Sequence, residues 1–132
     1  MEILVQSALK IFRMQTFIEK VTTELGDVVV HAIAYPNRSI FLWVTFSEGP
    51  VFGDFHFAVQ TEFSSIPAVS TRLGDAESTG RSVAIRLSKK LGVPVIVSWN
   101  LPEDFSSETQ VSVESRVFSI LKSRSSPSVI AA

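Results

Sequence analysis

Two segments of the chain, Val28–Tyr35 and Ser39–Phe46, have apolar side chains at odd and even positions alike. A strand with one face in water alternates apolar and polar residues. Here one face would hold Val28, Val30, Ala32, Ala34, Ile40, Leu42, Val44 and Phe46, and the opposite face would hold Val29, Ile33, Tyr35, Phe41 and Trp43, with His31 among them. Val95–Trp99 repeats the pattern. Both faces of the predicted sheet therefore need a cover.

The rest of the chain predicts how this sheet is built. Strands are expected at Met14–Leu25, Val28–Tyr35, Ser39–Phe46, Asp54–Glu62 and Val93–Trp99, with a short extended piece at Ala68–Leu73. A turn separates the first two strands at Gly26-Asp27, and another follows at Pro36-Asn37. Hairpin-connected strands come first and helices later, which predicts an α+β fold. We expect an antiparallel sheet of five to six strands with two helices on one face, in the order ββββ(β)αβα.

Two helices are predicted from 3.6-residue periodicity. In the first, the apolar face holds Val83, Ala84, Leu87 and Leu91; in the second, about Ser107 to Lys122, it holds Val113, Val117, Ile120 and Leu121. Ser78 or Thr79 is a suitable N-cap of the first helix, and Gly92 a suitable C-terminal stop. Lys89 and Lys90 would sit at the negative end of its dipole.

Length and composition suit one compact domain of 132 residues with a real core, since 45% of the residues are hydrophobic and 19% charged. We expect a lead-in at 1–13, a single domain at 14–123 and a flexible tail at 124–132.

There is no cysteine, which fits a reducing compartment. Glu2, Gln6 and Lys10 do not suit a signal peptide, and no apolar run is long enough to span a bilayer. A formal net charge of −1 does not call for nucleic acid or a membrane, so the expected location is the cytoplasm and nucleus.

No stretch predicts catalysis or a cofactor. The loop Arg72–Ser82 looks like a phosphate loop, but five residues separate Gly74 from Gly80 and Arg81 stands where a lysine is needed. We expect this loop to be structural, with Gly74 allowing a tight turn and Asp75 and Ser78 accepting from N–H groups at the helix entry.

The two histidines of the chain, and the acidic cluster that follows its last predicted strand, also favour a structural interpretation. His31 and His56 lie in apolar strands without metal-ligand spacing, so a satisfied or surface histidine is expected. Glu103, Asp104 and Glu108 favour a solvated loop over a calcium site. The prediction is therefore a protein that binds and is not an enzyme.

Two helices of ordinary length can cover one face of a five- or six-stranded sheet, and we do not expect them to cover both. Either the lead-in or the loop 47–57 folds over the second face, or a partner protein covers it. Charge is also uneven, because 72–90 is basic and 103–114 acidic. Such runs are either solvated faces or docking surfaces.

A series of short segments resembles the proteasome assembly chaperone 4 family. These are FLWV (Phe41–Val44), Ala58-Val59, SIPAVSTRLGD (Ser65–Asp75), STG (Ser78–Gly80), RLSKK (Arg86–Lys90), VIVSWNL (Val95–Leu101) and VESR (Val113–Arg116). Their order and spacing cover about residues 14–123. The chain departs from the family in its lead-in, its longer loop at 47–57, an apparent insertion at Ala68 and a tail lacking the hydrophobic-Tyr-any ending by which some proteasome-binding proteins enter ring pockets.

The resemblance implies a heterodimer with proteasome assembly chaperone 3 that binds α-subunits of the core proteasome and promotes ordered α-ring formation, without cofactor or catalysis. The family's contact residues do not reduce to a transferable motif, so we select residues on physical grounds. For the heterodimer face we predict Val29, Ile33, Tyr35, Phe41 and Trp43. For docking onto an α-subunit we predict Arg72, Arg81, Arg86, Lys89 and Lys90.

Two other functions remain open at the level of sequence. The chain could be a dimerising scaffold of the longin or roadblock kind in trafficking, which would associate with GTPases or coat complexes. It could also be a small-ligand enzyme that uses His31 or His56.

Overall fold

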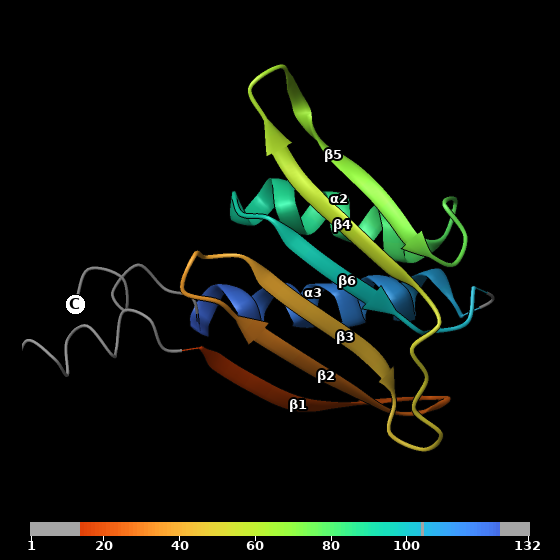
Figure 1. The fold of residues 1–132 in the computed structure, drawn as a ribbon. Coiled ribbons are helices and arrows are strands. Elements are labelled where there is room, and N and C mark those ends of the chain that lie inside the picture. Colours follow the sequence, from red (N-terminus) through yellow and green to blue (C-terminus); the bar gives the residue numbers. More distant parts are fainter. Residues whose placement is uncertain (1–13, 104, 125–132) are drawn as a thin grey trace, which may run out of the picture.

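The computed structural model describes residues 14–103 and 105–124. Six strands and two helices follow along the chain: β1 (Gln15–Thr23), β2 (Gly26–Ala34), β3 (Ile40–Phe46), β4 (Phe55–Thr61), β5 (Ser64–Leu73), α2 (Thr79–Leu91), β6 (Val95–Trp99) and α3 (Ser107–Arg124). The strands form one sheet in the order β1-β2-β3-β6-β4-β5, and both helices lie on the same side of it (Figure 1). The predicted α+β fold is confirmed.

One strand pair departs from the predicted antiparallel sheet. β3 and β6 run parallel, with Leu42 opposite Val97, while the other four pairs are antiparallel. β6 follows α2, and a helical crossover is the connection that lets a strand return parallel to an earlier one. The sheet is therefore mixed, with its last strand inserted between β3 and β4.

β5 begins earlier than the predicted extended piece, at Ser64 instead of Ala68. It pairs with β4 as a hairpin whose two central residues are Glu62 and Phe63. Tight hairpin turns favour Gly, Asn or Asp, and none stands here. Without that signal, the sequence does not predict the turn.

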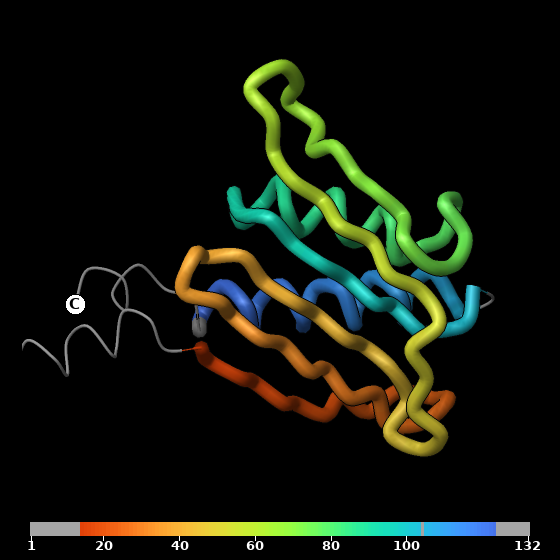
Figure 2. The backbone as a smooth tube through the Cα atoms, in the orientation of Figure 1, coloured from red at the N-terminus to blue at the C-terminus, as the bar shows by residue number. Residues whose placement is uncertain are grey.

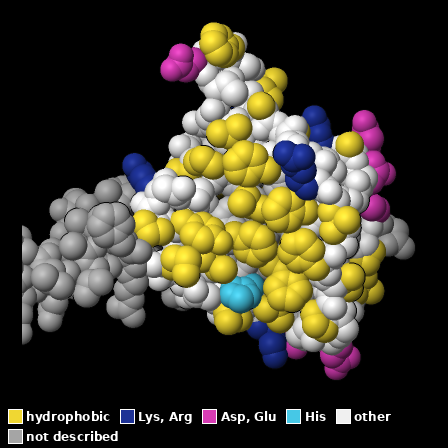
Figure 3. Space-filling view, in the orientation of Figure 1, with side chains coloured by type: hydrophobic (Ala, Val, Ile, Leu, Met, Phe, Trp, Pro, Cys, Tyr) yellow, Lys and Arg dark blue, Asp and Glu magenta, His cyan; other side chains and the backbone are white. Residues whose placement is uncertain are grey.

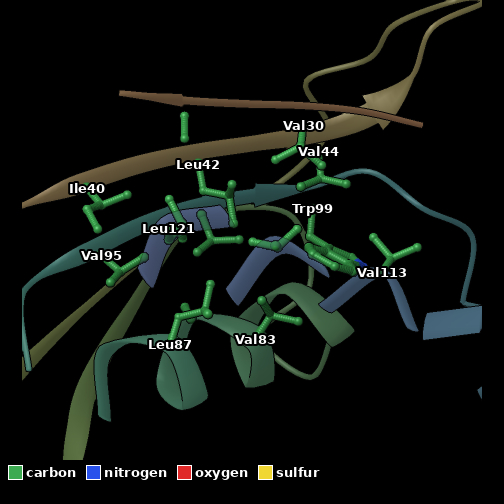
Figure 4. Close-up of a cluster of buried hydrophobic side chains, with 14 of the residues drawn as sticks. Val30, Ile40, Leu42, Val44, Val83, Leu87, Val95, Trp99, Val113 and Leu121 are labelled. Atoms are coloured by element: carbon green, nitrogen blue, oxygen red, sulfur yellow. The ribbon is translucent and has the colours of Figure 1, made fainter. Parts of the chain in front are cut away.

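The core lies between the sheet and the two helices. Alternate strand residues such as Leu42, Val44 and Val95 point toward Leu87 of α2 and Leu121 of α3 (Figure 4). All five are fully buried. Of the face that the alternation assigns to Leu42, the structure buries six residues and leaves Ala34 and Phe46 half-buried. No helix within the described ranges is long and apolar enough to cross a membrane.

The ends of α2 agree in part with prediction. Gly92 adopts φ 70° and its N–H donates to the Ser88 carbonyl at 2.9 Å. Ser78 holds the N-cap position, but its side chain makes no capping bond. Glu103 takes that role, accepting from the Thr79 N–H at 3.1 Å and the Thr79 hydroxyl at 2.7 Å.

The loop before α2 is held by its own backbone. Gly74 has φ 86°, as the tight turn requires, and a side chain there would meet Asp54 at 2.8 Å. The Asp75 carboxylate accepts from the Glu77 N–H at 2.8 Å. Glu77 lies just before the N-cap residue of α2. Gly74 thus acts as predicted, and Asp75 accepts from an N–H group of the loop that enters the helix, as predicted. The prediction for Ser78 is wrong, because its side chain makes no capping bond.

Candidate binding surface

The face of the sheet turned away from the helices, called here the open face, carries many of the apolar side chains that the core does not use. Strand register places His31 beside Trp43, Ile33 beside Phe41, and Phe41 and Phe57 on either side of Ile96. The open face consists of Val29, His31, Ile33, Phe41, Trp43, Phe55, Phe57, Val59 and Ile96, all of them half-buried. Figure 3 shows hydrophobic side chains gathered in one broad patch over the central strands, with charged groups around its border.

The loop between β3 and β4 covers one corner of the open face. The Phe52 ring lies 6.4 Å from Phe41, 6.4 Å from Trp43 and 6.0 Å from Phe55, measured between centroids. The Trp43 indole N–H donates to the Val51 carbonyl at 2.8 Å. Phe52 is itself 44% exposed. The loop therefore extends the apolar surface as much as it hides it.

The predicted heterodimer residues fall together. Val29, Ile33, Phe41 and Trp43 all belong to the open face, on the adjacent strands β2 and β3. Tyr35 is half-buried directly after the end of β2. Strand alternation was enough to bring these residues together.

The sequence reasoning did not single out the other half of the patch. Phe55, Phe57 and Val59 alternate with buried His56 and Ala58 along β4, and this alternation could have revealed them. Phe52 gave no such signal because it lies in a loop. Ile96 joins the patch through the parallel pairing of β6 with β3.

The predicted docking residues are spread out. Arg72 lies on the edge strand β5, Arg81 in the first turn of α2, and Lys89 and Lys90 in its last turn. Lys89 comes eight positions after Arg81 in the helix, which is roughly 12 Å along the axis. Arg72, Lys89 and Lys90 are exposed, whereas Arg81 is half-buried.

Two of these cations already have partners in the chain. Arg86 makes two bonds to Glu114 of α3, at 2.7 and 2.6 Å, and this contact raises the pKa of the Arg86 guanidinium. The Lys90 ammonium lies 5.0 Å from the centre of the Phe118 ring, with Lys122 at 5.8 Å. Lys89, Lys90 and Lys122 therefore form a basic end where α2 and α3 both terminate.

A buried polar cluster surrounds His56, which is fully buried. Its Nε2 lies 3.0 Å from Asp54 Oδ2 and 3.0 Å from Ser78 Oγ, and its Nδ1 lies 2.9 Å from Thr71 Oγ1. Asp54 Oδ1 accepts from the Trp99 N–H at 2.6 Å. Burial raises the pKa of Asp54, although the Trp99 and His56 bonds act to lower it.

Serine, histidine and aspartate so close together suggest a catalytic triad, but the geometry differs. In a triad the serine and the carboxylate bind opposite ring nitrogens. In this protein both Ser78 and Asp54 meet Nε2, and Thr71 holds Nδ1. With His56 sealed from solvent, the cluster joins β4, β5 and α2 and matches the predicted satisfied histidine.

The acidic group near 103–108 is only partly described by the structure. Glu103 is engaged with Thr79, and Asp104 lies outside the described residues. No group of three or more His, Cys, Asp or Glu side chains is arranged to hold a metal ion within those ranges.

Comparison with known proteins gives a family and a fold. The family model of proteasome assembly chaperone 4 matches residues 27–101, and no curated protein matches. Among solved structures, the fold is similar to a chain in the crystal structure of a chaperone complex for yeast 20S proteasome assembly. The TM-score is 0.64 at 19% identity, over 83% of this chain and 96% of that chain. Since the matched residues exceed half of the chain and span β2 to β6, the chain belongs to the proteasome assembly chaperone 4 family.

Proposed function

We propose that this chain is a chaperone for assembly of the core proteasome, acting as one half of a heterodimer with proteasome assembly chaperone 3 and promoting α-ring formation. The open face is the observation that carries this proposal. Family membership supports the assembly role, and the similar yeast fold comes from a chaperone complex. The chain acts by binding, without a cofactor.

The heterodimer forms through the open face. Burying apolar area contributes about 25 cal/mol per Å², and aromatic side chains dominate the energetics of interfaces. Phe41 and Trp43 lie at the middle of the patch between β2 and β6, so they are the expected anchors. Val29 and Ile33 extend the contact along β2, and Tyr35 extends it just past the end of that strand.

Docking onto an α-subunit uses cations that the partner subunit leaves accessible. The helices lie on the opposite side of the sheet from the open face (Figure 1). We assign the main electrostatic contact to Lys89 and Lys90, with Arg72 and Arg81 contributing at other points. Arg86 contributes less, because Glu114 already neutralises its charge.

Affinity purification from cell extract tests the assembly role. The tagged chain should recover proteasome assembly chaperone 3 and α-subunits, in particles that lack a complete set of β-subunits. Mature proteasomes should not carry it. Recovery of GTPases or coat proteins instead would show a trafficking scaffold and refute the proposal. Fractionation of the same cells should find the chain in cytoplasm and nucleus.

Paired variants test the interface. Trp43→Ser should abolish capture of proteasome assembly chaperone 3, because it removes a central aromatic anchor. Val111→Ser is the matched control, since Val111 is 63% exposed on α3, away from the open face. Equal capture by both variants would exclude the open face as the interface.

A further inference from the structure

The tip of the β4–β5 hairpin exposes an aromatic side chain almost completely. Phe63 is 95% exposed, more than any other large apolar residue among those described. In Figure 2 the tip extends past the rest of the sheet and stands clear of both helices. Single exposed apolar residues are common on protein surfaces, so exposure alone carries no conclusion.

The turn at the tip is not one of the favoured hairpin types. Thr61 pairs with Ser64, which leaves Glu62 and Phe63 as the two linking residues. Favoured two-residue turns need positive φ and therefore Gly, Asn or Asp. Arg38 is the one non-glycine residue with positive φ in the described ranges, so Glu62-Phe63 forms a less favoured turn.

Within the described residues Phe63 belongs to neither the core nor the partly buried shell around it, and no aromatic ring pairs with it. Phe63 thus has a poor turn, full exposure and no internal partner. Positions that break local rules without structural gain are where function is expected.

The hairpin is continuous with the open face. Directly below the tip, Val59 pairs with Ala68 and Phe57 with Ser70, and Phe57 and Val59 belong to the open face. The apolar surface therefore continues from Trp43 through β4 toward the tip. A register shift between Val59 and Thr61 bends the end of the hairpin, as bulges do.

We propose that the hairpin tip is an arm that grips the second subunit covering the open face, with the Phe63 ring inserted into an apolar recess of that subunit. This rests on the heterodimer proposed above. Val59 of the open face lies four residues before Phe63 on the same hairpin. A subunit that packs over Val59 therefore lies within reach of the tip. Glu62 beside the ring suits a recess with a basic or hydrogen-bonding rim.

Binding of full-length variants to purified proteasome assembly chaperone 3 tests the arm, by titration calorimetry. Phe63→Ser should weaken the affinity at least tenfold, whereas Phe63→Leu, which keeps an apolar side chain, should lose much less. Leu25→Ser is the matched control, because Leu25 is 61% exposed at the turn of the β1–β2 hairpin. It should stay within about twofold of the unmodified chain. Urea midpoints should be unchanged, since both side chains lie outside the core.

The outcomes separate the arm from the heterodimer itself. If Trp43→Ser abolishes binding and Phe63→Ser does not change it, the arm is refuted and the heterodimer stands. If Phe63→Ser leaves the heterodimer intact but prevents its capture of α-subunits, the tip contacts the proteasome instead, which also refutes the arm. If the unmodified chain does not bind the second chaperone, the heterodimer fails and the arm fails with it.

Discussion

Gly80 lies in the first turn of α2, against the buried pair Asp54 and His56. A Cβ at this position would stand 2.3 Å from Asp54 Oδ2 and 3.0 Å from the His56 ring. Alanine normally stabilises a helix relative to glycine by about 1 kcal/mol, but overpacking a tight site costs about 1–3 kcal/mol. The clash also disturbs the polar cluster. Gly80→Ala should therefore lower the free energy of unfolding by about 2 kcal/mol, measured by urea denaturation.

Gly53→Ala is the control for this prediction. Gly53 has no positive φ, and its nearest neighbour for a Cβ is Asn100 Oδ1 at 3.4 Å, so its urea midpoint should hardly move. A Gly80→Ala variant as stable as the unmodified chain would mean that Asp54 and His56 can shift without loss.

Asp54 gives a second prediction, on pH. Burial raises its pKa above the ordinary value of 3.8, so the folded protein holds this proton more tightly than the unfolded chain. The stability contributed by the group is therefore complete below the unfolded pKa and is lost as pH rises through the folded pKa. Asp54→Asn has no such proton, and its amide oxygen can still accept from Trp99.

Urea midpoints of the two proteins between pH 4 and 7 measure this effect. The difference in stability, unmodified minus Asp54→Asn, should decrease as pH rises. Subtracting the stability of Asp54→Asn from that of the unmodified chain cancels the contribution of every other titrating group that behaves alike in the two proteins. A difference that stays constant with pH, or increases, would show that the pKa of Asp54 is not raised in the folded state.

For single residues, the sequence predicts whether a side chain is structural better than it predicts the side chains to which it is hydrogen-bonded. His56 was expected to be either a satisfied or a surface histidine, and it is buried with hydrogen-bond partners at both ring nitrogens. Its partners Asp54, Thr71 and Ser78 come from three segments that only the folded sheet brings together. No spacing pattern in the sequence encodes that meeting.

Among the elements, the start of α2 depends on a distant side chain. Glu103 accepts two hydrogen bonds from Thr79 and places a negative charge at the positive end of the helix dipole. Glu103→Ala should cost about 1 kcal/mol, as loss of a cap does. For a chain of this size the melting temperature should fall by about 4 °C.

The control is Glu48→Ala, an exposed glutamate in the loop between β3 and β4, which should melt like the unmodified chain. Melting curves recorded by circular dichroism compare the three proteins. If Glu103→Ala and Glu48→Ala melt together, the contact with Thr79 does not stabilise the helix.

Elements were predictable where periodicity was strong. Alternation gave β2 and β3, and the 3.6-residue pattern gave both helices with Gly92 at the end of the first. The early start of β5 was missed because Glu62-Phe63 lacks turn residues. The parallel position of β6 was missed because local sequence does not say where a late strand enters a sheet.

For the whole molecule, two helices on one side of a six-stranded sheet leave the apolar side chains of the other side without a cover from helices. The helices bury one face, with Val30, Leu42 and Val97 almost without exposure. Across the sheet, the open face keeps Phe41, Trp43 and Phe57 half-buried, and the loop carrying Phe52 covers only a corner. Sequence alternation predicted this surplus, but the part contributed by β4 and Phe52 required the fold.

The two tryptophans allow a direct measurement of that open face. Trp99 is 4% exposed in the core, whereas Trp43 is half-buried on the open face. In the isolated chain, acrylamide should quench one accessible and one protected class of tryptophan fluorescence, and Trp43→Phe should remove the accessible class. When proteasome assembly chaperone 3 covers the face, the accessible class should disappear in the unmodified chain, provided that the partner's own tryptophans are replaced by phenylalanine. A Trp43 signal equally accessible with and without the bound partner would mean that the partner sits elsewhere. The surplus of apolar side chains on this face would then need another cover.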